Sequence, residues 1–386
     1  MPWEHWRLRC SNAAPSYPRV PMLVAFIFFG FFFSVCALML WWLVRAKPVI
    51  VASSDCPRVS ILVAARNEEA VIERCLASLT QLRYPTDKLE ILIADDASTD
   101  NTAGVVRRFI ADKPQFRLLT VRHRLGTARG KSNALAHLCR AATADYFFIT
   151  DADMALPPDW IQTMLGAAPD GVGVVTGVTT CNTTLFGRLQ GLDWLFGLSV
   201  IRLLTDHGLP VTAVGNNMLV TRAAYESIGG YEAMAFTVTE DLQLFSLIVA
   251  QGWGYRNLLD PRVLGVSVPQ PTVRCLLQQR KRWMKGAVRL PWQLSALFGL
   301  YALFYVAVFW PGLLSLGSIA VLFSAKVLCQ MVFLKITLRQ AGRRESWAVL
   351  LGYELYLCLM SGAVLVYTVV PGPIQWKERR YRWAEG

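Results

Sequence analysis

The hydrophobic and polar positions divide the chain into three parts. Residues 22–44 form an uninterrupted apolar run, and further apolar runs cover 294–309, 313–334 and 347–370. Runs of roughly 20 apolar residues are needed to cross the hydrocarbon core of a bilayer. Between residues 57 and 290 the chain alternates between polar and apolar segments, as soluble domains do. We therefore predict membrane helices on both sides of a soluble domain.

Short runs rich in β-branched and aromatic residues predict strands in this soluble part, with helical patterns between them. The strands are expected at 59–64, 89–94, 116–121 and 146–150, and the helices are expected to begin near Glu68, to run through Ile110 and to cover 132–141. Strands that alternate with helices indicate an α/β fold, with a parallel sheet and helices on both faces. No phosphate-binding glycine motif of the dinucleotide or P-loop type follows a strand, so those two classes are not supported.

The composition agrees with a membrane protein. Of the 386 residues, 54% are hydrophobic and 17% are charged, and the mean hydropathy is +0.37. The net charge of +12 belongs to cytoplasmic flanks in such a protein, and no nucleic-acid motif accompanies it, so we expect no nucleic-acid partner. The nine cysteines form no C-x-x-C pair, which indicates free thiols in a reducing compartment.

The basic residues give conflicting information about topology. Arg45 and Lys47 follow a tryptophan pair at the end of the first apolar run, which predicts a cytoplasmic soluble domain. If the three later runs all crossed, the basic tail at 372–386 would lie outside. If 294–309 were interfacial or re-entrant, the tail would return to the cytoplasm, but the basic loop at 339–344 would be misplaced. We favour a cytoplasmic tail and leave the number of spans at three or four.

Polar clusters follow three of the predicted strands. The first strand leads into residues 66–69, the second ends at Asp95 and Asp96, and the fourth ends on Asp151 and Asp153. An isolated Asp-x-Asp is most often a solvated turn, but ligands bind where the carboxyl ends of parallel strands meet. Two carboxylates suit a divalent cation that shares its remaining ligands with phosphates. The sequence therefore predicts a site for a nucleotide diphosphate at this edge.

A fourth acidic segment opens an apolar helix at 242–250. Thr239 is a suitable N-cap residue, and Glu240 and Asp241 follow it. Acidic residues in a first turn are favoured by the helix dipole alone. In the functional interpretation, Asp241 is a general base that takes a proton from an attacking hydroxyl. Both interpretations remain open at this point.

A fifth motif combines Gln279, Arg282 and Trp283 on one face of a predicted helix. The arginine could hold a diphosphate leaving group, and the tryptophan could stack on a sugar ring. Basic and tryptophan residues are also expected beside a membrane segment for structural reasons.

The ordered series of motifs resembles the membrane-bound family 2 glycosyltransferases, whose nucleotide-binding fold is called GT-A. This group includes cellulose, hyaluronan and poly-N-acetylglucosamine synthases and ceramide glucosyltransferases. The matching segments are 65–69, 95–100, 130–134, 151–153, 239–241 and 279–283. The organisation that the resemblance implies is a polar segment at 1–20, a transmembrane helix at 21–45, a GT-A domain at 57–290 that ends in an interface helix, membrane helices at 294–371 and a basic tail at 372–386.

The resemblance also implies a role for each motif residue. The nucleotide-binding residues would be Glu68, Asp95, Asp96, Lys131 and Asp151, although Lys131 could also be an ordinary loop residue. The ligands of Mg²⁺ or Mn²⁺ would be Asp151 and Asp153. The catalytic residues would be Asp241, as the base of an inverting transfer, and Glu240. The platform for the acceptor and the diphosphate would be Gln279, Arg282 and Trp283.

The expected function is transfer of a sugar from a nucleotide sugar, with UDP as the expected nucleotide, to a membrane lipid. The membrane part is small, and the tail at 374–381 is similar to tails of lipid-directed members. One alternative is a processive polysaccharide synthase that uses a growing glycan as acceptor. An alternative of another class is a catalytically silent membrane scaffold that binds nucleotides. A transporter is disfavoured, because the soluble middle is too large and no acidic relay is evident inside the apolar runs. The exception, Glu354, could simply face a neighbouring helix. We expect a multi-pass protein of the cell membrane, with a cytoplasmic catalytic domain.

Overall fold

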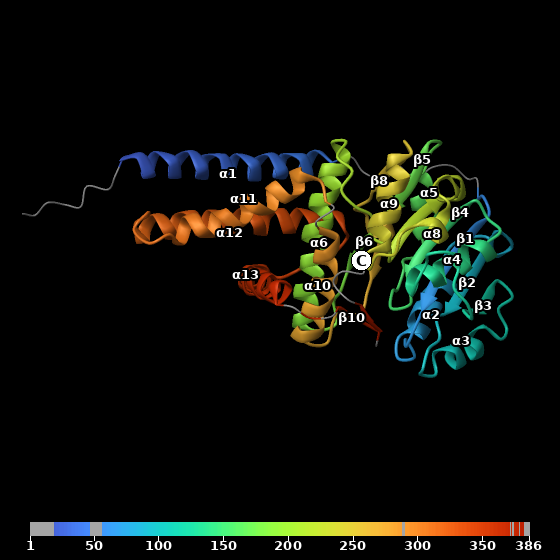
Figure 1. The fold of residues 1–386 in the computed structure, drawn as a ribbon. Helices are drawn as coiled ribbons and strands as arrows, with labels where there is room; N and C mark the ends of the chain where they lie inside the picture. Colours follow the sequence, from blue (N-terminus) through green and yellow to red (C-terminus); the bar gives the residue numbers. More distant parts are fainter. Residues whose placement is uncertain are drawn as a thin grey trace, which may run out of the picture.

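The computed structural model describes residues 19–46, 56–287, 290–370, 372, 374–377 and 379–381. An α/β domain lies at one end of the molecule, and long apolar helices extend from it (Figure 1). Two helices stand between these parts, α6 (Leu185–Asp206) and α10 (Val273–Ala287).

The core of the α/β domain is a seven-stranded sheet with the order β3-β2-β1-β4-β7-β5-β8. Its strands are β1 (Val59–Ala65), β2 (Leu89–Asp95), β3 (Phe116–Thr120), β4 (Tyr146–Asp151), β5 (Val172–Thr176), β7 (Asn217–Thr221) and β8 (Gly254–Asn257). The strands predicted from the sequence correspond to β1, β2, β3 and β4, which run parallel. The sheet as a whole is mixed, since β7, a strand that was not predicted, is antiparallel to both β4 and β5. An apolar strand looks the same in either direction, so its residue pattern does not report this reversal.

Helices cover both faces of the sheet, as predicted. The helices of this domain are α2 (Ile72–Thr80), α3 (Thr102–Ile110), α4 (Lys131–Ala141), α5 (Trp160–Gly166), α7 (Arg222–Ser227), α8 (Gly230–Ala233) and α9 (Glu240–Ala250). Successive residues of a strand point to opposite faces. Accordingly, Phe148 packs in one core with Trp160 of α5, whereas Phe147 packs in the other with Leu135 of α4. The helix expected near Glu68 begins only at Ile72, because the intervening residues form a loop at the end of β1.

Shorter elements complete the chain. They are a pair of parallel strands, β6 (Val178–Thr180) and β9 (Leu264–Val266), two 3-10 helices, Thr86–Lys88 and Pro261–Val263, and an antiparallel hairpin of β10 (Ile374–Trp376) and β11 (Arg379–Tyr381). The hairpin belongs to the basic tail, and its first strand packs against α10.

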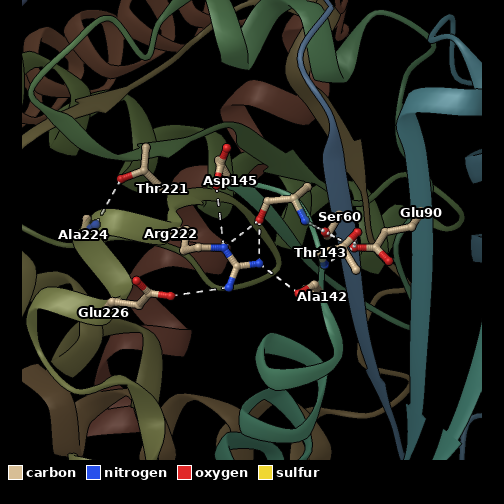
Figure 2. Close-up of polar contacts among 10 residues, drawn as sticks. Ser60, Glu90, Ala142, Thr143, Asp145, Thr221, Arg222, Ala224 and Glu226 are labelled. Atoms are coloured by element: carbon tan, nitrogen blue, oxygen red, sulfur yellow. Dashed lines mark hydrogen bonds and ion pairs between the residues drawn. The ribbon is translucent and has the colours of Figure 1, made fainter.

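At the amino-terminal edge of the parallel strands, hydrogen bonds from Arg222 hold the chain together (Figure 2). The Arg222 guanidinium donates to the carbonyl of Ala144 at 3.0 Å and to that of Ala142 at 2.9 Å. It also lies 3.8 Å from Asp145, whose side chain is 86% exposed. These contacts connect the chain before β4 with the chain after β7. Asp145 and Asp151 thus lie at opposite ends of the same strand region, which makes Asp145 a useful control.

Four helices of the described residues are long and apolar enough to cross a membrane. They are α1 (Arg19–Arg45), α11 (Trp292–Phe309), α12 (Leu316–Gln340) and α13 (Trp347–Val369). The predicted break at residues 310–312 lies between α11 and α12. Helix α12 is longer than predicted, so Lys335 and Arg339 lie on the helix itself and not in a loop.

Both ends of α13 contact the helices next to the sheet domain. Just before α13, Glu345 forms an ion pair with Arg188 of α6 at 2.5 Å. Just after it, Lys281 of α10 donates to the carbonyl of Val370 at 2.8 Å. Figure 1 shows α13 nearly end-on, whereas α1 and α12 run across the view. The axis of α13 is therefore strongly inclined to the other long helices.

A buried polar cluster joins three of the apolar helices. Lys326 Nζ of α12 lies 2.5 Å from Glu354 Oε2 of α13. The hydroxyl of Tyr305 of α11 donates to Glu354 at 2.7 Å, and Lys326 also donates to Gln330 at 2.9 Å. Glu354 is evident in the sequence as an acidic residue within an apolar run, but its partner is not, because the two residues lie on different helices. Glu354 is therefore a paired charge inside the helix bundle.

We expect Lys326→Met to destabilise the protein by roughly 3 kcal/mol or more, because it leaves a buried carboxylate without its cation. The double variant Lys326→Met with Glu354→Gln removes both charges and should recover much of this loss. Thermal unfolding in one detergent would measure both variants against the unchanged protein. Equal stability of the single and double variants would show that the ion pair does not hold the helices together.

Candidate active site

The ends of three parallel strands meet at one edge of the sheet. In the strand register, Ala65 of β1 pairs with Asp95 of β2, and Ala64 pairs with Asp151 of β4. The polar residues that follow these strands are therefore neighbours. This placement confirms the predicted convergence of strand ends, while the roles assigned to the residues stay predictions.

Lys131 connects two of the predicted motifs. It is the first residue of α4, and its Nζ lies 2.6 Å from Asp151 Oδ1 and 3.3 Å from Glu240 Oε1. Burial alone would lower the pKa of Lys131, but the carboxylates of Asp151, Glu240 and Asp241 raise it overall. Lys131 thus places a stable positive charge between the end of β4 and the start of α9. It is not an ordinary loop residue.

Asp153 is held beside this cluster. Its Oδ2 accepts a hydrogen bond from the Ser267 hydroxyl at 2.9 Å. Burial raises the pKa of Asp153, and the neighbouring charge of Asp151 raises it further. The two carboxylates therefore repel each other in a partly desolvated place, and a positive ion between them would relieve that repulsion.

The donor set of this pair is compatible with Mg²⁺ or Mn²⁺. Among the described residues, no group of three or more His, Cys, Asp or Glu side chains could hold a metal ion. Asp151 and Asp153 can supply two hard oxygen ligands, which leaves the other positions to water and phosphate oxygens, as Mg²⁺ commonly requires. A zinc site built only from protein ligands does not fit these residues.

Asp241 is fixed by two backbone N–H groups. Its Oδ2 accepts from Gly215 at 2.9 Å and its Oδ1 accepts from Leu242 at 2.9 Å. A Cβ on Gly215 would lie 2.8 Å from the Cβ of Asp241, so only glycine permits this approach. Thr239 occupies the N-cap position, but its side chain makes no capping hydrogen bond, which corrects the prediction for that residue. The Thr239 hydroxyl is instead paired with that of Thr237 at 3.3 Å.

The two acidic residues of this segment differ in their surroundings. Glu240 is buried, and burial raises its pKa while Lys131 opposes the rise. Asp241 is only partly buried. Each of its oxygens uses one lone pair on a backbone N–H and has a second one left for another donor. Asp241 is therefore the better placed of the two to accept a proton from an incoming hydroxyl.

An open pocket brings α10 to the cluster. Lys131, Glu240 and Arg282 all line it, together with Arg129 and Phe236. Gln279 and Trp283 are absent from this lining. The ring of Trp283 packs instead against Trp194 of α6, with ring centroids 4.7 Å apart, and the Arg280 guanidinium lies 4.2 Å from its centroid. The predicted platform is therefore divided, with Arg282 in the pocket and Trp283 against α6.

The other three predicted nucleotide-binding residues, Glu68, Asp95 and Asp96, lie at or just after the ends of the first two strands. The side chains of Asp95 and Asp96 are buried, and Asp95 Oδ1 accepts from the Ser98 backbone at 3.3 Å. Glu68 lies 2.7 Å from Lys377 of the tail hairpin. Burial raises the pKa of Glu68 to about 7, although Lys377 opposes this shift. The tail at 374–381 is distinctive in the sequence, but the contact of Lys377 with Glu68 is not predictable, because nothing in the tail indicates where it folds back.

Comparison with known proteins finds a matching family and several relatives. A family model described as glycosyl transferase family 21 matches residues 22–386. A β-monoglucosyldiacylglycerol synthase from Synechocystis is 30% identical over 234 residues, which are 60% of this chain and 48% of that protein. A poly-β-1,6-N-acetyl-D-glucosamine synthase from Staphylococcus aureus is 28% identical over 238 residues, which are 59% of this chain and 54% of that protein. The chain thus spans about half the length of the curated relatives it matches.

A solved structure supports the fold. It is a mannosyltransferase from Pyrobaculum calidifontis in complex with GDP-Man and Mn²⁺, and it is 23% identical to this chain. The match covers 90% of this chain and 99% of that one, with a TM-score of 0.55. The likeness confirms the predicted GT-A type of α/β fold.

Proposed function

Because the chain belongs to glycosyl transferase family 21, a family of glycosyltransferase enzymes, we propose that it transfers a sugar from a nucleotide sugar to a membrane lipid. Family membership also agrees with the family 2-like resemblance of its motifs. The observation that carries the proposal is the meeting of Lys131, Glu240 and Arg282, from three separate helices, around one pocket, where Lys131 also pairs with Asp151 of β4.

In this proposal the nucleotide diphosphate lies at the carboxyl edge of the sheet. Lys131 and Arg282 supply positive charge toward the phosphates, and Glu68, Asp95 and Asp96 lie on the side of the nucleoside. Asp151 and Asp153 would hold Mg²⁺ or Mn²⁺. The bound ion would neutralise charge that develops on the departing diphosphate. We propose UDP as the nucleotide.

The transfer is proposed to be a single displacement. Asp241 accepts the proton of the acceptor hydroxyl, and the hydroxyl oxygen attacks the anomeric carbon. The bond between that carbon and the diphosphate oxygen breaks, and its electron pair leaves with the nucleoside diphosphate. Attack from the face opposite the leaving group inverts the configuration at the anomeric carbon. Lys131 and Arg282 stabilise the negative charge on the leaving group.

The position of the pocket favours a lipid acceptor. Arg282 belongs to α10, which stands between the sheet domain and the apolar helices (Figure 1). A hydroxyl presented at a membrane surface would thus be close to Asp241. The lipid-directed name of the Synechocystis relative supports this choice. The sheet domain is proposed to be cytoplasmic, where nucleotide sugars are made.

Two alternatives remain testable. The Staphylococcus aureus relative is named as a synthase of a polysaccharide, which keeps a polymer product as the second candidate. A silent nucleotide-binding scaffold is the candidate of another class. It is disfavoured because the motif carboxylates Asp151, Asp153 and Asp241 are all present.

The test is transfer from labelled UDP-sugars and GDP-sugars by membranes that contain the protein, with products divided between organic solvent and water. Label in the organic phase, absent from membranes without the protein, would support a glycolipid synthase. Label in a large water-soluble product would support the polymer synthase instead. Nucleotide binding without transfer to any lipid or glycan fraction would support the scaffold.

A further inference from the structure

The tail hairpin reaches the loop that follows β1. Lys377 stands at the turn between β10 and β11, and its Nζ lies 2.7 Å from Glu68 Oε2. The same Nζ donates to the carbonyl of Asn67 at 3.3 Å. The carbonyl of Lys377 in turn accepts from Arg66 Nε at 3.3 Å. Three consecutive residues at the carboxyl edge of the sheet therefore hold the turn of the hairpin.

Unusual backbone conformations converge at this contact. The φ angle is 52° at Asn67, 54° at Ala97 and 46° at Lys377, and in the described part of the chain no other non-glycine residue has a positive φ. Arg66 connects these places, because its guanidinium also donates to the carbonyl of Ala97 at 2.6 Å. Such angles are uncommon for residues with side chains, although asparagine adopts them more readily, and they cluster at ligand sites. Their convergence from three distant segments indicates a built site.

The contact brings a positive charge near the carboxylates at the strand ends, since Lys377 interacts electrostatically with Asp153. Glu68 interacts electrostatically with Asp151 and Asp153 as well as with Lys377. Lys377 therefore shares the electrostatic surroundings of the proposed diphosphate site, where Lys131 already pairs with Asp151. The two contacts of the Lys377 ammonium use two of its three N–H donors. The third can donate to a phosphate oxygen.

The hairpin is also tied to the helix that carries Arg282. Lys281, the neighbour of Arg282, donates to the carbonyl of Val370 at 2.8 Å, just before the hairpin. Strand β10 packs against α10, on the side that faces the sheet domain (Figure 1). A shift of the hairpin would therefore displace α10 as well as the loop after β1.

We infer that the hairpin β10–β11 is part of the donor site and that Lys377 binds the diphosphate of the nucleotide sugar. This inference rests on the proposed function and adds to it a residue from a distant part of the chain. Lys377 and Lys131 contact the diphosphate from different elements, and Arg66 holds the turn of the hairpin against the end of β1.

The test compares Lys377→Met with the unchanged full-length protein in detergent, by calorimetric titration with UDP, GDP and UMP. We expect binding of the preferred nucleoside diphosphate to weaken about 10-fold, the effect of losing one charge-assisted hydrogen bond. Binding of UMP, which lacks the second phosphate, should weaken much less. The donor KM should rise by a similar factor with a smaller change in kcat. Lys377→Arg should retain most of the affinity, and Lys88→Met, at an exposed lysine of the same domain, should change nothing.

Several results would overturn the inference while leaving the proposed function intact. In each, the unchanged protein transfers sugar. Lys377→Met then binds the diphosphate as tightly as before, or its affinities for UMP and UDP fall by the same factor, or its affinity for UDP rises. The last result would mean that the hairpin hinders access to the donor site. If the unchanged protein neither binds UDP or GDP nor transfers sugar, the proposed function fails, and the inference fails with it.

Discussion

Replacing Asp241 by asparagine is expected to reduce the rate of transfer by about 10²–10⁴-fold, the usual range for loss of a general base. The amide cannot take the proton of the acceptor hydroxyl. It can still accept one of the two backbone hydrogen bonds, from Gly215 or Leu242, so the loop geometry should be nearly kept. Binding of the donor should change little, since the residue acts on the acceptor. Steady-state transfer and UDP binding would measure the two effects separately.

Glu240→Gln is the matched comparison, because it changes the neighbouring carboxylate in the same way. Glu240 is buried and paired with Lys131, so its loss should disturb the charge of the pocket and affect donor binding more than proton transfer. Asp145→Asn, at the exposed opposite end of β4, should leave transfer unchanged. If Glu240→Gln lowered kcat far more than Asp241→Asn did, the assignment of Asp241 as the base would be wrong.

Asp153→Asn is expected to lower transfer by about 10²–10³-fold, because the divalent ion would lose one of its two protein ligands. The same variant should be at least as stable as the unchanged protein. The Ser267 hydroxyl, which donates to Asp153, can donate equally to the oxygen of an amide in its place. Burial raises the pKa of Asp153, so removing the charge relieves a cost in the folded state. Activity and stability should therefore change in opposite directions.

The measurement is transfer as a function of Mn²⁺ and Mg²⁺ concentration, together with thermal unfolding in detergent. The unchanged protein should lose transfer after chelation and should be stabilised by the added ion. Asp153→Asn should need a much higher ion concentration or show no response. An unchanged ion titration in this variant would argue against a metal between Asp151 and Asp153. Asp145→Asn again controls for the loss of one carboxylate.

The sequence was sufficient where the signal is local. Short apolar runs identified β1, β2, β3 and β4, and the polar residues after them were correctly expected at one edge. Helix α4 begins at Lys131, within one residue of its expected start. In each case a short segment carries its own pattern, and the rule that parallel strands share an edge supplies the rest.

The sequence was insufficient where the structure depends on contacts between distant segments. The direction of β7 is set by the path of the chain after α6, and its apolar residues would suit either direction. The pairing of Lys326 with Glu354 depends on how two apolar helices cross. The contact of Lys377 with Glu68 depends on the path of the whole membrane part. Charge and hydropathy along the chain report none of these.

The ion pair between the tail and Glu68 has a consequence for the path through the bilayer. Both ends of the segment from residue 290 to Lys377 lie on the side of the sheet domain, since Leu290 packs against Leu204 of α6 and Lys377 pairs with Glu68. A chain that leaves and returns on one side crosses an even number of times, yet three candidate helices lie within this segment. We propose that α13 is the helix that does not cross, because contacts at both of its ends hold it beside α6 and α10.

Helix α13 would then lie along one leaflet, and α11 and α12 would form an out-and-back pair. The basic loop at 343–344 and the basic tail would both face the cytoplasm, which removes the conflict that the charges pose when every apolar run is made to cross. A helix embedded in a single leaflet, beside α10, displaces lipid from that leaflet alone. The proposed lipid acceptor would then reach the pocket by lateral diffusion within the leaflet that faces the sheet domain, without first having to flip across the bilayer.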